Sequence, residues 1–225
     1  MPRPQAALDY AKRFVGQLPV DDAAIKLRVL NDAHAKLWMA APWRWTVESL
    51  EVVTVVNDQQ EYDLEEHEDF LFLVSSKITD GESIHDLIPC STLPVTDVFK
   101  GLPRQVQYVK GEPDKLRLFP VPTGYSNPPK ILSVYKRKLT PLSEENIDED
   151  YSNLGIPDEW FWVYQEIVLL KAMQFAHDPR LGGVTYSEGK AAYTGQHGVV
   201  EAVIDEMRRA EEKFFDSLGM VVTHE

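Results

Sequence analysis

The first forty residues follow the apolar pattern of helices. A longer helix is predicted over residues 21–40, with Asp21 as a residue of the N-cap type at its start. Pro42 disfavours the helical conformation in the residue before it, so the helix should end there. A shorter helix is expected over residues 5–16. The apolar stripe of the longer helix consists of Ile25, Val29, Ala33 and Leu37.

After Pro42 the pattern becomes that of β-strands. Residues 48–64 are rich in β-branched side chains around an Asn-Asp pair at 57 and 58, which predicts a hairpin. Between residues 46 and 139 we expect about five to seven strands, because turn-forming residues separate several such runs. The other strand candidates are residues 70–78, 104–111, 115–122 and 130–139.

The last third of the chain returns to helical patterns. Residues 143–155 are acidic and poor in large apolar groups, which predicts a linker. Pro157 suits the first position of a helix that runs to about residue 177 and is apolar on nearly every face, as a buried helix is. Five glycines predict a mobile loop over residues 182–198.

A final helix is expected over residues 199–218. Its two faces differ in character, as in an amphipathic helix at the surface. The apolar face would carry Val200, Val203, Ile204, Met207, Phe214 and Phe215, and the solvent face Glu201, Asp205, Glu206, Arg208, Glu211 and Glu212.

These elements predict an α+β fold in which an antiparallel β-rich module is inserted into a helical bundle. Residues 1–42 and 156–225 would form the bundle, residues 43–142 the module and residues 143–155 the acidic linker.

Composition is that of an ordinary globular protein, with 44% hydrophobic and 26% charged residues among 225. One cysteine, Cys90, allows no internal disulfide and no cysteine-based metal site. No apolar run approaches the roughly 20 residues of a membrane helix, so we expect synthesis in the cytoplasm and no membrane partner.

The net charge of −13 argues against a protein whose main task is to bind phosphate backbones. Its distribution is uneven, because residues 41–97 hold two basic and thirteen acidic side chains. Residues 98–138 hold only Glu112 and Asp114 against nine basic side chains. A basic module between acidic flanks can be a solvated surface or can orient neighbouring subunits.

Motifs for chemistry are weak. Glu65, Glu66, Glu68 and Asp69 surround His67, but adjacent acids are more typical of a solvated turn than of a site. The calcium-loop spacing of Asp148, Asp150, Ser152 and Glu159 lacks the required glycine and is interrupted by a proline. Phosphate-loop, nucleophile-elbow and zinc-protease motifs are absent. We therefore expect no catalytic residue, no cofactor and no metal.

Several stretches together resemble the head-to-tail adaptor, or connector, proteins of tailed phages, the group related to the tail-tube adaptor of short-tailed phages. The resemblance covers roughly residues 20–215 in the same order. It is one of structural pattern and includes no catalytic motif. The stretches are residues 41–49 (APWRWTVES), 57–64 (NDQQEYDL), 101–122 (GLPRQVQYVKG to KLRLFPVP), 130–143 (KILSVYKRKLTPLS) and 156–173 (IPDEWFWVYQEIVLLKAM).

The resemblance implies a virion protein of the head-tail junction. About twelve copies would form a ring under the portal, bind the portal and tail or nozzle proteins, and let DNA pass without sequence-specific binding. The contact residues expected for such an assembly are Trp43, Arg44, Trp45, Lys100, Arg104, Lys110, Lys115, Arg117, Lys136, Arg137 and Lys138.

An alternative is a nucleic-acid-binding module on the basic β region, with Tyr108, Phe119 and Tyr135 as stacking groups. Trp43 and Trp45 lie where the helix ends and the module begins, so at least one of their rings should be buried. Alternation along the first strand should place Trp45 and Val47 on one face.

Overall fold

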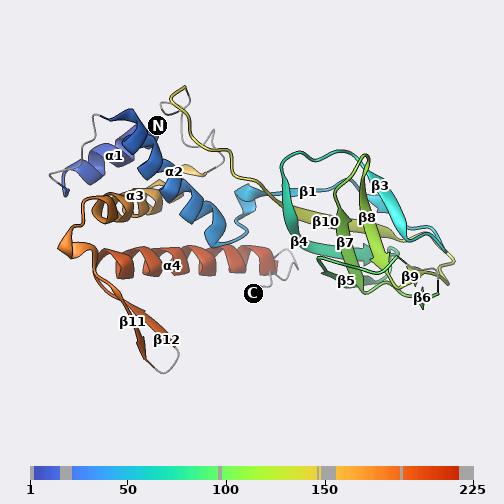
Figure 1. Cartoon of the computed structure of the whole chain (residues 1–225). Coiled ribbons are helices and arrows are strands. Elements are labelled where there is room, and N and C mark those ends of the chain that lie inside the picture. The colour runs from blue at the N-terminus through green and yellow to red at the C-terminus, as the bar shows by residue number, and fades with distance from the viewer. Residues whose placement is uncertain are drawn as a thin grey trace. The chain divides into compact units, whose positions relative to one another are not determined.

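The structure is a computed structural model that describes residues 3–15, 22–95, 98–145, 147, 156–187 and 190–217, with the backbone alone for residues 187, 190 and 214–217. It has mixed α and β content, as expected (Figure 1). The chain divides into two compact units. The helical unit is Met1–Trp45 with Leu139–Phe214, and the β unit is Thr46–Lys138 with Phe215–Glu225.

The two N-terminal helices are α1, Pro4–Lys12, and α2, Ala23–Ala40. The cap of α2 is Asp22, whose carboxylate accepts the N–H of Ala24 at 2.9 Å, and not Asp21, which lies outside the described residues. The helix ends at Ala40 because Ala41, before Pro42, is extended. Val29, Ala33 and Leu37 of the predicted stripe are buried, and Ile25 is half-buried.

The third helix, α3, Phe161–Phe175, is buried along most of its length, as its apolar pattern predicts. A turn of 3-10 helix, η3 (Asp158–Trp160), precedes it, so Pro157 caps this turn instead of opening the α-helix. Both α1 and α2 pack against α3. Its buried residues are Val163, Tyr164, Ile167, Val168, Leu169, Leu170, Ala172 and Met173.

The last helix, α4, Gly195–Ser217, adds Val200, Ile204 and Met207 to the same core. The prediction that Glu211 faces solvent is wrong, since its side chain is buried beside Arg44. The side chains of residues 214 and 215 lie outside the described set.

Residues 182–198 do not form one long loop, because they contain a hairpin of β11, Val184–Ser187, and β12, Lys190–Tyr193, and because α4 already begins at Gly195. The short 3-10 helix η4, Pro179–Leu181, leads into it. At the base of the hairpin Gly182 has a φ of 77°, and a Cβ there would lie 2.0 Å from the carbonyl oxygen of Thr194. A glycine is therefore required where the two strands of the hairpin meet.

The first residues after the β unit are bound to the helical core by hydrogen bonds and by apolar contacts. Asn31 of α2 accepts the N–H of Leu142 at 2.7 Å and donates its amide to the carbonyl of the same residue at 3.0 Å. Leu142 and Ile147 are buried in the helical core. The predicted linker at 143–155 falls mostly outside the described residues, and so does the candidate calcium loop, except for Glu159.

The β unit contains more strands than predicted, because several are too short to leave a pattern. A curled sheet has the strand order β1-β10-β4-β5-β7-β8-β3, with β2 paired to β10, and β6 pairs with β9 apart from it (Figure 1). The strands are β1 Val47–Ser49, β2 Val53–Thr54, β3 Glu61–Leu64, β4 Phe70–Thr79, β5 Ile84–Pro89, β6 Lys100–Gly101, β7 Gln105–Val109, β8 Asp114–Phe119, β9 Val121–Pro122 and β10 Lys130–Arg137.

The predicted turn at Asn57 and Asp58 forms, and Asp58 adopts a φ of 65°. The predicted hairpin does not, because β2 pairs with β10 while β3 pairs with β8. The first and last strands of the unit, β1 and β10, are antiparallel neighbours, with Val47 opposite Lys136. Alternate residues of the strands fill the core, as Leu116 and Leu118 of β8 do.

The two tryptophans lie where α2 gives way to the first strand, and one ring is buried, as predicted. Trp43 is fully buried, and its indole N–H donates to the carbonyl of Leu37 at 2.6 Å. Trp45 is half-buried and stacks on it with ring centroids 5.5 Å apart. The predicted alternation of Trp45 and Val47 is wrong, because Arg44–Thr46 forms a 3-10 turn, η1.

We expect Trp43→Ala to lower the free energy of unfolding of the helical unit by about 3–5 kcal/mol, because it empties a buried site and leaves the carbonyl of Leu37 without this donor. Urea unfolding followed by the helical circular dichroism signal measures this loss. Trp45→Ala serves as the matched control and should cost clearly less, since that ring is only partly buried. Equal losses for the two variants would contradict the assignment.

Candidate functional site

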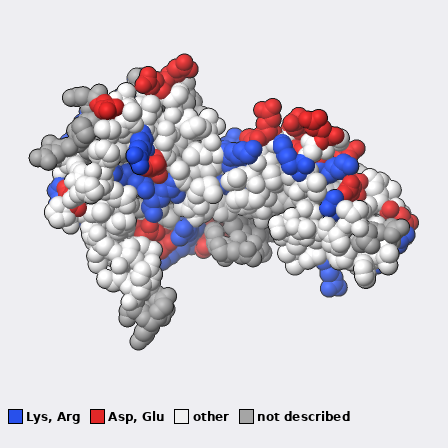
Figure 2. Space-filling model, viewed as in Figure 1, with Lys and Arg blue, Asp and Glu red and all other residues white. Residues whose placement is uncertain are grey.

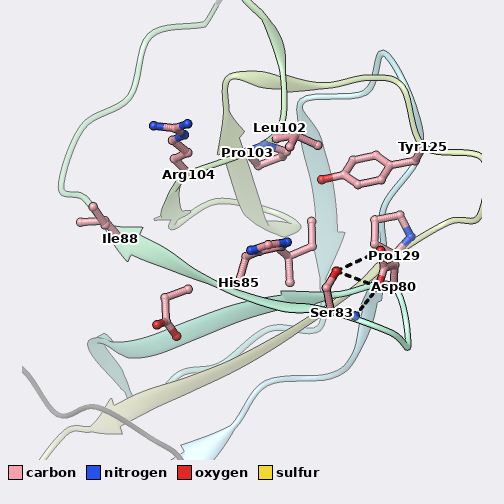
Figure 3. A pocket seen from close by; sticks show the side chains of 11 residues that line it. Asp80, Ser83, His85, Ile88, Leu102, Pro103, Arg104, Tyr125 and Pro129 are labelled. Carbon is pink, nitrogen blue, oxygen red and sulfur yellow. Dashed lines mark hydrogen bonds between the residues drawn. The ribbon is translucent and has the colours of Figure 1, made fainter.

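A pocket of about 600 Å³ opens in the β unit, at the place where its sheet splits (Figure 3). Strand β5 pairs with β4 from Ile84 to Leu87, but with β7 only at Ile88 and Pro89. The pocket lies beside this incompletely paired stretch. One wall comes from β5 and the other from the segment that leads into β7.

The split arises because the segment before β7 leaves the sheet. Lys100–Gly101, which is β6, pairs with β9 instead. Pro103 has no N–H to offer a neighbouring strand. As Figure 3 shows, Leu102, Pro103 and Arg104 face β5 across the gap.

The backbone of β5 has one open side at the pocket. The N–H groups of Ile88 and Cys90 donate to Arg104 and Val106, each at 2.8 Å, on the β7 side. Because alternate residues of a strand point their N–H and C=O groups to the same side, those of Ile84 and Asp86 also point there. Within the described part of the chain, these two residues have no backbone partner on that side.

The side chains around the pocket combine apolar and charged groups. Ile88 and Leu102 line the pocket and are exposed by 62% and 60%. Ile84, on the same strand as Ile88 but outside the lining, is exposed by 66%. The Asp80 carboxylate is held by its own turn, because the N–H groups of Glu82 and Ser83 donate to it at 3.0 and 2.8 Å (Figure 3). These features suit the binding of another polypeptide better than that of a small polar ligand.

On the face of the β unit that Figure 2 shows, basic and acidic groups are interspersed and the basic ones form no continuous patch. Glu61 receives both Arg117 at 2.6 Å and Lys115 at 3.2 Å, and these cations hold the pKa of its carboxyl below the usual value despite burial. Further ion pairs of this set are Lys100–Asp58, Lys110–Asp114 and Arg137–Glu48.

Three further candidate contact residues differ greatly in exposure. Arg104 and Lys138 are exposed, and the Lys138 ammonium donates to the carbonyl of Glu68 at 3.0 Å. Lys136 is buried and donates to the hydroxyl of Thr46 at 2.7 Å. Burial lowers the pKa of Lys136 to about 7, and the charge of Arg137 contributes. Lys136 is therefore an internal residue and no longer a contact candidate.

The candidate residues at the tryptophans also have partners within the helical unit. Arg44 is exposed, and its guanidinium lies 3.1 Å from Glu159 and 3.5 Å from Glu211. Burial raises the pKa of the Glu211 carboxyl, although Arg44 acts in the opposite direction. Trp43, which is fully buried, leaves the set of contact candidates for the same reason as Lys136.

Four donors converge on the carboxylate of Asp114 in the β unit. It is fully buried, and it accepts from the hydroxyl of Tyr108, the N–H groups of Gly111 and His67, and the ammonium of Lys110. Burial alone would raise the pKa of Asp114, but these donors outweigh it and lower the pKa to about 2. The carboxylate joins the turn before β8 to the acidic loop that begins β4.

The ring of His67 belongs to an adjoining network instead of a fully solvated turn. Its Nε2 lies 3.2 Å from Glu51. Tyr135 is buried beside it, and its hydroxyl lies within hydrogen-bond distance of carboxylate oxygens of Asp69, at 2.9 Å, and Glu48, at 3.1 Å. Among the residues that the structure describes, no group of three histidine, cysteine or acidic side chains could hold a metal ion.

The aromatic side chains proposed for base stacking are largely covered. Tyr135 is 1% exposed, and the ring of Tyr108 stacks on Phe70 with centroids 3.5 Å apart. Phe119 is half-buried and makes an edge contact with Phe99. These three rings therefore do not form an open row of the kind that single-strand binders use.

The model of one protein family, described as the SU10 adaptor protein, matches residues 5–213. This span covers most of the chain. The chain belongs to the SU10 adaptor protein family. The resemblance to phage adaptors seen in the sequence is thereby confirmed.

As an SU10 adaptor, the chain is a phage adaptor protein, and a structural role and a place in the virion follow from the family. A comparison with curated proteins finds no match. No described helix combines the length and the apolar character needed to cross a membrane.

The sequence identified Arg104 by its charge but missed β5 as part of the site. The stretch IHDLIP has no clear alternation, and its proline argues against a central strand. Only the register with β4 and β7 reveals that one side of this strand is open.

We expect Asp114→Asn to lower the free energy of unfolding of the SU10 adaptor by about 2 kcal/mol near pH 6, since one pKa unit corresponds to about 1.4 kcal/mol. The folded pKa lies below the unfolded value of 3.8, so this stability is present above that value and is lost as the pH falls towards 2. About half of it should be gone by pH 3.

Urea unfolding of both proteins between pH 6 and 3 measures the difference. The control is Asp63→Asn on the neighbouring strand β3, where the side chain is exposed. A difference for Asp114→Asn that stays constant over this range would contradict the assignment.

Proposed function

We propose that this adaptor forms a ring of about twelve copies beneath the portal of a tailed phage, where it extends the DNA channel and provides the platform for tail attachment. The family match over residues 5–213 carries the proposal, since it assigns an adaptor role to nearly the whole chain. The partners would be further copies of the chain, the portal, and tail or nozzle proteins.

The exposed surface supports a role in protein contacts. Large apolar side chains stand out on both units, among them Ile88 and Phe99 of the β unit and Tyr186 of the helical unit. Exposed apolar groups of this size are typical of surfaces that become covered on assembly. Within this proposal the helices, residues 1–42 and 156–225, form a bundle that builds the ring, and the module at 43–142 carries the docking surfaces.

The charge supports free passage of DNA. With a net charge of −13, and with many of its basic side chains in internal ion pairs, the chain has little cationic surface for phosphate groups. Like charge along a channel would keep a passing duplex from adhering. Of the proposed contact residues, the accessible ones are Arg44, Trp45, Lys100, Arg104, Lys110, Lys115, Arg117, Arg137 and Lys138.

We expect purified adaptor to form rings of about twelve copies when mixed with purified portal, and to stack on the portal as one layer. Negative-stain electron microscopy and sedimentation velocity of the adaptor with and without portal measure this. Subunits that stay monomeric and unbound in the presence of portal would contradict the proposed function.

Duplex and single-stranded DNA serve as controls in the same experiment. The free adaptor should bind neither appreciably at physiological salt. An affinity that falls steeply with salt would instead support nucleic-acid binding by the β unit.

A further inference from the structure

The β11–β12 hairpin has little support from its own chain. Every described side chain on its strands is exposed, with Tyr186 at 78%, Tyr193 at 42% and Val184 at 39%. An isolated two-stranded hairpin is marginally stable in water, so this one requires a further contact. Its surface is uncharged where Figure 2 describes it.

The base of the hairpin is nevertheless well defined. The N–H of Thr194 donates to the carbonyl of Gly183 at 3.0 Å, and its hydroxyl accepts the N–H of Gly183 at 3.1 Å. Together with the close approach at Gly182, these bonds hold the two strands together where they leave the helices. The hairpin is therefore built to project as an arm.

The open side of β5 lacks a partner strand, just as the hairpin lacks a supporting surface. Natural sheets protect an edge with lysine, proline, a bulge or a covering segment. No lysine or proline lies in Ile84–Leu87, and the segment with Leu102 and Pro103 stands across the pocket without pairing to it. The exposed Ile84 and Ile88 flank the open N–H and C=O of Asp86. Such an edge is a template for an added strand.

We propose that β11 of one subunit adds to the open side of β5 of a second copy and places Tyr186 in the pocket of that copy. This inference rests on the proposed function, because it concerns how subunits join. The open stretch Ile84–Leu87 and the strand Val184–Ser187 are both four residues long. β11 can therefore pair with the open stretch of β5 along its whole length.

The alternation of β11 also fits the pocket. Val184 and Tyr186 lie on one face of the strand and Thr185 on the other. In the paired position the first face meets the pocket, where Leu102, Pro103 and Tyr125 offer apolar and aromatic surface. A tyrosine buries much area at a small entropy cost and often dominates such contacts.

The donor and the acceptor are different surfaces of the same chain. Contacts of this heterologous kind repeat from subunit to subunit and close into a ring when the rotation permits. Each subunit has one unsupported hairpin and one open side of β5. A second copy is therefore the occupant that satisfies both. An extended segment of a tail protein would satisfy only the acceptor.

The backbone of Asp86 provides the sharpest test. Asp86→Pro removes the N–H that faces the gap but no bond to β4, so the β unit should keep its fold. We expect this variant to raise the concentration for half-assembly about tenfold or more, while the matched Asp86→Ala, which keeps the N–H, stays within about twofold. Sedimentation and circular dichroism report assembly and folding separately.

The aromatic contact is tested in the same assay. Tyr186→Ala should weaken assembly by about tenfold or more, and Tyr186→Phe should retain most of it, because the ring supplies the buried area. No effect of Tyr186→Ala would overturn the place of Tyr186 in the pocket.

A cross-link identifies the partner strand. In a Cys90→Ser background, protein with Asp86→Cys is mixed with protein carrying Thr185→Cys, and we expect a disulfide between the two species under mild oxidation, since neighbouring strands bring Cα atoms within bonding range. Each protein alone should give little cross-linked dimer.

The outcomes separate the two proposals. Rings that form without this cross-link and tolerate Asp86→Pro would overturn the inference and leave the proposed function standing. Protection of the β5 amides from hydrogen exchange by the portal alone, without ring formation, would assign the edge to a different occupant and overturn it as well. A wild-type chain that never assembles, even with portal, would contradict both.

Discussion

The burial of α3 is the constraint on which the helical unit depends. Eight of its side chains are buried, so the helix needs cover on several sides at once. α1 and α2 provide part of that cover, and Val200, Ile204 and Met207 of α4 join the same core. Residues from both sides of the β unit are thus required to complete one apolar core, although 93 residues, Thr46–Lys138, intervene between them.

Polar contacts then determine where the chain leaves and re-enters this core. The indole of Trp43 is bonded to the last turn of α2, and Asn31 holds both backbone groups of Leu142. Both bonds involve buried or half-buried groups, so the loss of either would leave a polar atom without compensation. The β unit has its own equivalent in the carboxylate of Asp114, which joins the turn before β8 to the loop that follows β3.

From the sequence, we predicted the helices and strands with strong apolar periodicity, and also the resemblance to phage adaptors. The helices at α2, α3 and α4 and the strands β4, β7, β8 and β10 were expected because their apolar side chains recur at regular spacing. The hairpin β11–β12 was missed because its glycines suggested a loop, whereas they serve the close approach at its base. Strand β5 was missed because its sequence IHDLIP has no clear alternation and ends in a proline, and the open edge becomes visible only in the register with β4 and β7. Charge alone misjudged Lys136, since burial depends on the neighbours that the fold supplies.

The pairing of β1 with β10 has a consequence for how such proteins can change over time. Residues directly opposite in an antiparallel pair have Cα atoms about 5 Å apart, and Val47 and Lys136 are so placed at the two ends of the inserted segment. To the helical unit, the whole insertion is equivalent to a short loop, because its entrance and exit coincide. An exchange of genetic material at these two points could replace one β domain with another and leave the helical core intact.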